Sequence, residues 1–372
     1  MKKLKFLFRT IVICLIFGLL YLNVSERFET YSEINQGLMK NFYKQEKNSI
    51  DVVYVGSCHA YSTFIPHKLW DDYGVTSHVL ASSGQEVQMS YYYLKEALKT
   101  QKIKTAVVEV YGVNRMDSYI PLDEFDKSVI FGFQSLKMSM DKIKYAFEYD
   151  NTANSNLELL FGLYSAHDRW DYQSETPMRE VDFERFQRDY TFMANRWKEY
   201  WHIEENADEN AILNYPQNDI VEDFDEVSEE YLLKIIELCK NEGINLVLTS
   251  APYEIKDIEV SRLNKVKKIA ESNNVPYINF NDQKLIEKLD LHYYDMIDAN
   301  HVDYSGAVKI SDYVNKFIIE NYPIESKKGN PKYASWDDGT QKVLSDNGRE
   351  YWYDDAAFEQ INVDNNEHLN VE

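Results

Sequence analysis

The sequence holds a serine and an aspartate–histidine pair at positions where an α/β fold would bring them together. Ser57 follows Gly56 and the apolar, β-branched run 51–55, whereas Asp298 and His301 stand far downstream, just before a segment with helical spacing. Buried parallel strands have this composition, and functional side chains gather beyond their carboxyl ends. These residue types predict nucleophilic catalysis, in which a hydroxyl attacks and an imidazole removes its proton.

The predicted roles follow from the chemistry of acyl transfer. His301 would act as the base for Ser57, and Asp298 would hold the other ring nitrogen of the imidazole. The tetrahedral intermediate carries an oxyanion that needs hydrogen-bond donors. We expect these donors to be the backbone N–H groups of Ser57 and Gly84 and the side-chain amide of Asn114. Gly84 has no side chain to keep the backbone at a distance.

Three further residues, His59, Gln85 and Tyr111, are expected to line the site, with His59 packing beside the nucleophile. Each catalytic residue also has a simpler interpretation: Ser57 in a tight turn, Asp298 as a helix N-cap, and the histidine as a core or capping residue. Only their occurrence together, in this order, favours catalysis. The sequence has no CxxC or HExxH motif and no histidine cluster, so we expect neither a metal nor another cofactor.

Strands and helices alternate through most of the chain. The expected strands are 51–55, 77–81, 104–111, 245–252 and 276–280, and the expected helices are 67–74, 86–100, 228–242, 259–273, 282–289 and 304–322. Alternation of this kind predicts a parallel sheet with right-handed crossovers. The expected fold is a three-layer α/β/α sandwich of the flavodoxin-like type, with a catalytic domain over residues 49–322.

Two segments break this alternation. Residues 115–225 are rich in aromatic and charged residues, and we interpret them as a mostly helical insertion. Residues 323–372 form an acidic C-terminal extension, for which a small hairpin around Trp336 is plausible and a disordered end is expected.

The N-terminus reads as a membrane anchor. Four cations, Lys2, Lys3, Lys5 and Arg9, precede the almost wholly apolar run 10–24. Such a pattern predicts a transmembrane signal anchor over residues 1–25 whose basic end stays in the cytoplasm, followed by a juxtamembrane linker over 26–48. A cleaved signal peptide is the alternative, but small residues are lacking at a cleavage site. The expected location is therefore the cell membrane, with a single span and the C-terminal domain outside.

Composition excludes some functions and leaves others open. The chain of 372 residues has 62 acidic against 40 basic side chains and a net charge of −22, which argues against nucleic-acid binding. Three cysteines are too few for a disulfide scaffold. A bridge between Cys58 and Cys239 and two separate buried thiols both remain open.

Four short blocks together resemble the SGNH (GDSL-like) hydrolase superfamily, whose blocks supply a Ser, a Gly, an Asn and an Asp-x-x-His in that order. The matching residues are Gly-Ser57, Ser-Gly84, Gly-Val-Asn114 and Asp298-Ala-Asn-His301. The first block here reads Val-Gly-Ser-Cys-His instead of the common Gly-Asp-Ser form. The resemblance implies the same fold and a serine nucleophile.

The anchor and the Gly-Ser-x-His opening look more like the membrane-linked branch of that superfamily. This branch includes proteins that O-acetylate exported polysaccharides such as alginate, and the D-alanine transfer protein of teichoic acids. The resemblance implies a membrane-bound O-acyltransferase as partner and a surface polysaccharide or wall polymer as acceptor. The expected function is extracytoplasmic, serine-dependent acyl transfer, with O-acetyl as the expected group. The alternatives are a carbohydrate esterase with the same triad and a non-catalytic scaffold of a glycan synthesis or export complex.

Overall fold

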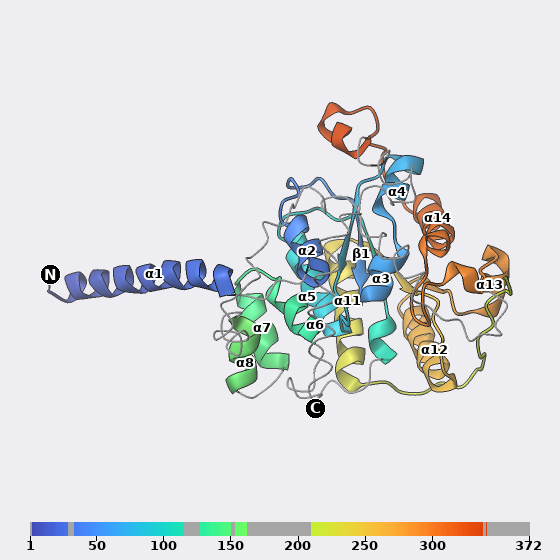
Figure 1. Cartoon of the computed structure of the whole chain (residues 1–372), viewed down its shortest axis with the longest axis horizontal. Helices are drawn as coiled ribbons and strands as arrows, with labels where there is room; N and C mark the ends of the chain where they lie inside the picture. The colour runs from blue at the N-terminus through green and yellow to red at the C-terminus, as the bar shows by residue number, and fades with distance from the viewer. Residues whose placement is uncertain are drawn as a thin grey trace.

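A five-stranded parallel sheet lies at the centre of the computed structural model, which describes residues 2–28, 33–114, 127–149, 153–161, 210–337 and 340. The strands are β1 (Val52–Gly56), β2 (Ser77–Ala81), β3 (Thr105–Glu109), β4 (Asn245–Ser250) and β5 (Tyr277–Asn279), in the order β2-β1-β3-β4-β5 (Figure 1). This is the flavodoxin-like strand order. The expected parallel α/β class is confirmed.

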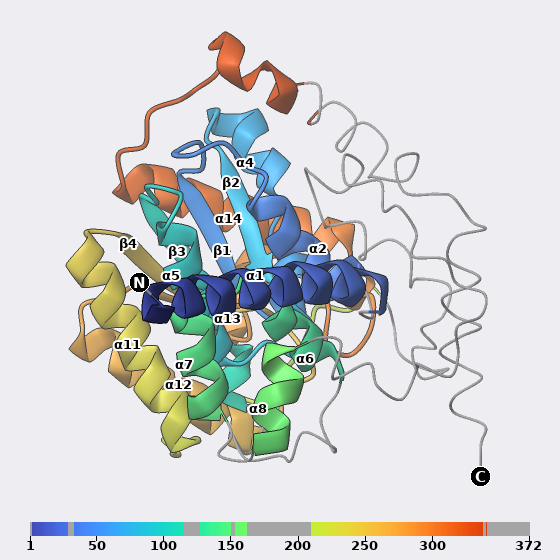
Figure 2. The ribbon, with the colours of Figure 1, turned by 90° about the vertical axis from the view of Figure 1, so that its left-hand side faces the viewer.

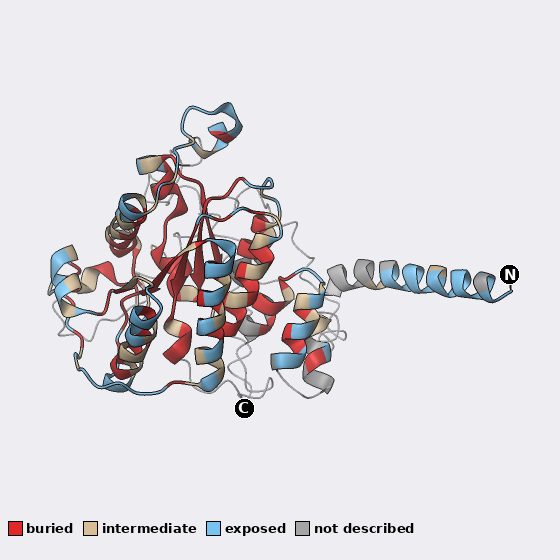
Figure 3. Cartoon of the chain, turned by 180° about the vertical axis from the view of Figure 1, so that it is seen from behind, coloured by how far each residue is buried: buried red, intermediate tan, exposed pale blue. Residues whose placement is uncertain are grey.

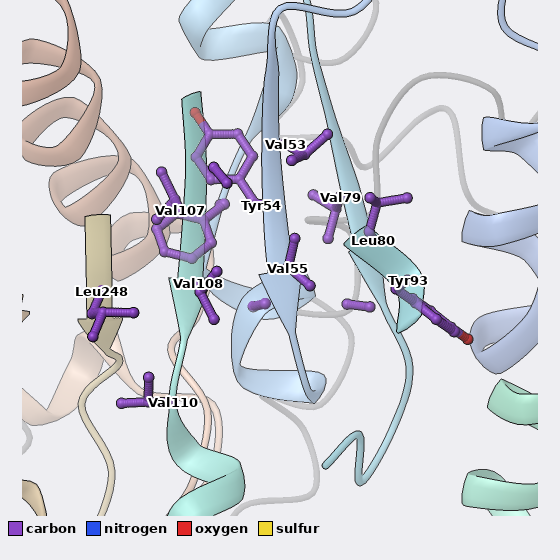
Figure 4. Close-up of a cluster of buried hydrophobic side chains, with 14 of the residues drawn as sticks. Val53, Tyr54, Val55, Val79, Leu80, Tyr93, Val107, Val108, Val110 and Leu248 are labelled. Atoms are coloured by element: carbon purple, nitrogen blue, oxygen red, sulfur yellow. The ribbon is translucent and has the colours of Figure 1, made fainter. Parts of the chain in front are cut away.

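Branched apolar side chains explain why these segments form strands. Every residue of β1, β2 and β3 is buried, as expected for strands covered on both faces. Figure 4 shows side chains of β1 to β4, among them Val53, Val79, Val107 and Leu248, around the central strands. Burial is concentrated on the sheet and on the inner sides of its helices (Figure 3).

Helices cover the sheet on both sides. The helices around the sheet are α2 (Glu33–Phe42), α3 (Cys58–Thr63), α4 (Pro66–Tyr73), α5 (Val87–Leu98), α11 (Glu226–Glu242), α12 (Asp257–Ser272), α13 (Gln283–Leu289) and α14 (Tyr304–Asn321). Helices α5 and α11 pack together on one face, and α3, α4 and α14 pack together on the other. Parallel crossovers are right-handed as a rule, and this rule accounts for helices on both faces because the chain goes from β1 to β2 on one side and then to β3 on the other.

The region of the expected insertion is mostly helical between residues 127 and 161, where the structure describes 127–149 and 153–161. Helices α6 (Lys127–Gln134), α7 (Met140–Tyr149) and α8 (Ala153–Leu160) belong to it. Residues 210–225 instead run without helix over the core, and Ile212 forms an isolated bridge to His292. The remaining parts of the expected insertion lie outside the described residues.

Residues 331–337 of the C-terminal extension are helical where the first arm of a hairpin was expected, and the second arm lies outside the described residues. A short 3-10 helix, η5 (Pro331–Tyr333), continues in helical turns through Asp337. These turns dock on α4, because Trp70 Nε1 donates to Asp337 Oδ1 over 2.9 Å and the rings of Trp70 and Trp336 lie 5.6 Å apart. The expected disordered end lies outside the described residues.

Helix α1 (Lys2–Phe28) projects from the body of the molecule (Figures 1 and 3) and lies in front of the other elements in Figure 2. Its described large apolar side chains are exposed; Phe6, Phe8 and Phe17 are examples. Among the residues that the structure describes, no helix has the length and apolarity needed to cross a membrane.

Candidate active site

The turn between β1 and α3 creates the site. A Cβ atom on Gly56 would lie 2.8 Å from Cβ of Glu109, so only glycine lets β1 leave the sheet this close to β3. Helix α3 then begins at once with Cys58, and Ser57 is its N-cap: the Ser57 Oγ accepts the N–H of His59 over 3.3 Å. Serine is a favoured N-cap because its oxygen satisfies a free backbone donor.

The structure gives the Ser57 hydroxyl a second partner at the end of β3. It is buried and donates to Oε2 of Glu109 over 3.3 Å, while Oε1 of Glu109 accepts the N–H of Tyr111 over 2.9 Å. Among the described residues it makes no hydrogen bond to His301. These contacts match the turn role that the sequence also allowed for Ser57.

Asp298 and His301 form a closely held pair. The Nδ1 atom of His301 lies 2.9 Å from both carboxylate oxygens of Asp298, and Asp298 Oδ1 also accepts the N–H groups of Asn300 and His301 over 2.7 and 2.8 Å. One carboxylate therefore folds the loop and orients the ring. The Nε2 atom of His301 is buried and has no hydrogen-bond partner of normal length and angle among the described residues.

Cys58 is the side chain that meets this imidazole. The sulfur of Cys58, one ring nitrogen of His59 and one ring nitrogen of His301 all lie within 4.8 Å of one another. Both Cys58 and Cys239 are free thiols, so the bridge left open by the sequence is not formed. The three donor atoms are also close enough to share a metal ion, a cluster that the sequence did not indicate because His301 is distant along the chain.

The electrostatics couple Cys58 to His301. Burial alone would raise the pKa of Cys58, but the hydrogen bond and charge of His301, then hydrogen bonds from the Gly84 backbone and Ser57, lower that pKa overall. Burial alone would lower the pKa of His301, but Asp298 and Cys58 raise that pKa to about 10. Both shifts favour a thiolate beside an imidazolium at neutral pH.

Gly84 and Asn114 occupy different places around the thiol. Gly84 has a φ of 64°, and this left-handed turn presents its backbone to the sulfur of Cys58, which is where an oxyanion donor belongs. The amide of Asn114 is buried, and its Nδ2 donates to Oη of Tyr253 over 2.7 Å. In this structure Asn114 therefore adjoins the site through Tyr253.

Aromatic rings form one wall of the site. The buried ring of His59 stacks on Tyr111 with centroids 3.8 Å apart, and it lies 5.4 Å from Tyr253 and 5.1 Å from His301. Burial, and secondarily the charge of His301, hold the pKa of His59 well below its ordinary value. His59 is therefore neutral in this wall.

Gln85 supports the site from behind. It is buried, and its amide nitrogen donates to Leu80 O and Ser90 Oγ over 3.3 and 3.1 Å while its oxygen accepts from Ser82. These bonds brace the loop that carries Gly84.

Helix packing holds the two halves of the site together. Oγ of the buried Ser311 on α14 accepts the N–H of Ile65 and donates to the carbonyl of Thr63, each over 3.0 Å. These bonds tie the end of α3 to the helix that follows His301. Asp303 caps α14 by accepting the N–H of Gly306.

The sequence predicted no part in the site for Cys58 or Tyr253, and it indicated Glu109 only as a residue that could occupy the place of Asn114. Glu109 ends β3 and Tyr253 follows β4, so the strand-end rule used for Gly84 and Asn114 also applies to them. Burial, with a contribution from the charge of Cys58, raises the pKa of Glu109 to about 8. Its carboxyl group is therefore mainly protonated at neutral pH.

Comparisons with known proteins assign no family to this chain. No family model matches the sequence, and no curated protein matches it. Among solved structures, a candidate acylhydrolase from Bacteroides fragilis is similar at 9% sequence identity and a TM-score of 0.39, over 78% of this chain and 98% of that one. A TM-score of this size does not establish a shared fold.

Proposed function

We propose that the protein is an acyl-transfer enzyme of the cell envelope. It takes an acyl group, O-acetyl in the simplest case, from an ester donor onto a nucleophile at the start of α3, and passes it to a hydroxyl of a surface polysaccharide or wall polymer. The observation that carries this proposal is the Asp298–His301 pair, because Asp298 holds Nδ1 and the imidazole lies beside the start of α3 and the backbone of Gly84.

Each step uses a group already described. The nucleophile adds to the donor carbonyl, and a backbone N–H at Gly84 stabilises the oxyanion. The imidazolium of His301 then gives its Nε2 proton to the departing alkoxide, which leaves as the alcohol. In the second half-reaction Nε2 takes the proton of the acceptor hydroxyl, which attacks the acyl-enzyme. Asp298 fixes the ring and stabilises its charged form in both halves.

Location at the membrane is part of the proposal. Helix α1 has basic residues at its start and exposed apolar side chains between Phe6 and Leu20. We propose that this segment tethers the body outside the membrane, beside a membrane-bound O-acyltransferase that delivers the acyl group. Protease treatment of intact cells would test this location. A domain outside the membrane should be digested, whereas a domain on the cytoplasmic side would stay protected.

Product analysis with the purified full-length protein, an aryl acetate donor and an oligosaccharide acceptor tests the activity. We expect acetylated oligosaccharide, with the rate reduced about 10²- to 10⁴-fold in His301→Ala, as typical for loss of a general acid–base. His292→Ala is the matched control, since His292 bonds to Asp290 and the Asn210 carbonyl, not to the site. Dominant free acetate would instead indicate an esterase, and the absence of both products would favour a scaffold. Full activity in His301→Ala would contradict the role of the Asp298–His301 pair.

A further inference from the structure

Cys58 and Ser57 are adjacent, yet their side chains meet different partners. The Ser57 hydroxyl bonds to Glu109 and to the first turn of α3. The Cys58 sulfur lies within 4.8 Å of a nitrogen of His301. Ser57 is the N-cap and has extended backbone, whereas Cys58 is the first residue of α3. The two side chains therefore leave the turn in different directions, and the sulfur is the one that lies beside the imidazole.

We propose that the nucleophile is the Cys58 thiol and not the Ser57 hydroxyl, so that Cys58, His301 and Asp298 form the catalytic triad. This inference rests on the proposed function and specifies its covalent intermediate as a thioester. Ser57 then serves as a positioning residue that caps α3 and holds the turn.

The groups around the sulfur favour its ionised form. The groups facing it are His301 with its partner Asp298, His59 and Glu109. His59 is neutral, and Glu109 is mainly protonated near pH 7, because burial shifts both pKa values in that direction. The imidazolium of His301 is thus the charge that the thiolate meets, in the manner of cysteine–histidine hydrolytic enzymes.

The reaction balances with these groups alone. The Cys58 thiolate forms a C–S bond with the donor carbonyl carbon. The C–O bond to the leaving alkoxide breaks, and the alkoxide takes the proton from Nε2 of His301 and departs as the alcohol. The acceptor hydroxyl next gives its proton to Nε2 and forms a C–O bond with the acyl carbon. The C–S bond then breaks and restores the thiolate beside the imidazolium.

Intact-mass analysis of the full-length protein after brief exposure to an aryl acetate tests the assignment. We expect a single acetyl adduct on the wild type and on Ser57→Gly, released by hydroxylamine at neutral pH, and none on Cys58→Ala. Glycine is chosen at position 57 because it also caps helices. Cys14→Ser, which changes an exposed cysteine on α1, should keep the adduct.

The opposite pattern would overturn the inference: an adduct on Cys58→Ala that is lost in Ser57→Gly makes Ser57 the nucleophile. If no variant or wild type forms an adduct or acetylated product, the proposed function itself fails. Iodoacetamide labelling then still reports on the thiol. A site-specific rate that rises through a midpoint below the ordinary cysteine pKa supports a reactive Cys58, whereas slow labelling with an ordinary midpoint contradicts it.

Treatment with a chelator distinguishes a free Cys58 thiolate from a Cys58 sulfur that binds a metal ion. Labelling of Cys58 should be the same before and after treatment of the protein with EDTA. A many-fold increase in labelling after chelation would show that the sulfur binds a metal ion, and would overturn its role as a free nucleophile.

Discussion

The single carboxylate of Asp298 controls the ring of His301 and, through it, the charge of Cys58. It contacts Nδ1 with both oxygens and closes the loop through two backbone N–H groups. Because the loop and the ring share one acceptor, the imidazole has little freedom to rotate away from the sulfur.

Replacing Asp298 by asparagine should therefore weaken the thiolate. Loss of the negative charge lowers the pKa of His301, and the weaker imidazolium lets the pKa of Cys58 rise. The thiolate exists above the Cys58 pKa and is lost as the pH falls through that pKa. The pH midpoint of labelling should therefore rise by about one unit, which is a tenfold change in the acid dissociation constant of the thiol. Iodoacetamide pH–rate profiles measure this shift. Asp290→Asn, next to His292, is the control, and an unchanged midpoint in Asp298→Asn contradicts the coupling.

Glu109 predicts a dependence of stability on pH. Its pKa is raised to about 8 in the folded chain, so between pH 5 and 8 the unfolded state binds fewer protons than the folded state. Stability should then fall as the pH rises through this window, by on the order of 1 kcal/mol per unit. Glu109→Gln should flatten this slope in urea unfolding at pH 5 and 7.5. Equal pH slopes for Glu109→Gln and the wild type would contradict the role of Glu109. Glu242→Gln, which changes an exposed glutamate, is the control for the loss of a surface charge.

The spacing of residues in the sequence indicated where the site lies, but not which side chain is the nucleophile. The Asp298-x-x-His301 pattern predicts a pair because three residues of loop can return an imidazole to a carboxylate. The choice between Ser57 and Cys58 depends on where α3 begins, and a one-residue shift of that start would exchange their directions. Sequence spacing does not carry this information.

The turn from β1 to α3 is the element on which the site depends. The turn has no room for a side chain at Gly56, because a Cβ atom there would lie 2.8 Å from the Cβ atom of Glu109. Any residue other than glycine must push α3, and with it Cys58, away from β3.

Gly56→Ala should destabilise the fold by about 1–3 kcal/mol, as overpacking does, and should slow iodoacetamide labelling of Cys58. Gly243→Ala is the control: its φ of 69° also disfavours alanine, yet its Cβ would meet nothing within 4 Å. Thermal unfolding and labelling rates measure both effects. If both variants label at the wild-type rate, the turn does not position the thiol.

Strands and long helices could be predicted because each repeats one pattern over many residues. The run at 51–55 differs from β1 by one residue at each end, the run at 77–81 coincides with β2, and the amphipathic segment 304–322 ends one residue after α14. Helix α3 was not predicted: its Cys-His-Ala-Tyr-Ser-Thr sequence has weak helix propensity apart from alanine. Its N-cap and its packing on α14 hold it in place, and packing partners distant in sequence are not visible in a local pattern.

In the molecule as a whole, α1 contributes little to the core. Its described side chains are mostly exposed, and the ring of Tyr21 meets Phe161 edge-on at 5.6 Å. The buried interior begins with α2, through Leu38, Met39 and Phe42.

A chain without residues 1–28 should therefore stay folded and keep a reactive Cys58. We expect a melting temperature within about 4 °C of the full-length value, equivalent to roughly 1 kcal/mol for a domain of this size. A chain that also lacks α2 should unfold, because it loses three buried apolar side chains. Differential scanning calorimetry distinguishes the two, and unfolding of the shorter truncation would show that α1 is part of the core.

The layered arrangement of the helices also determines how the protein would respond to peroxide. Cys239 lies on α11, on the opposite face of the sheet from α3, where burial raises its pKa to about 12, and Cys14 lies on the projecting α1. The sequence holds no fourth cysteine. A sulfenic acid formed at Cys58 would thus have no neighbouring thiol to trap it as a disulfide, and further oxidation to the sulfinic acid is irreversible. The activity would then depend on reductants supplied from outside the molecule.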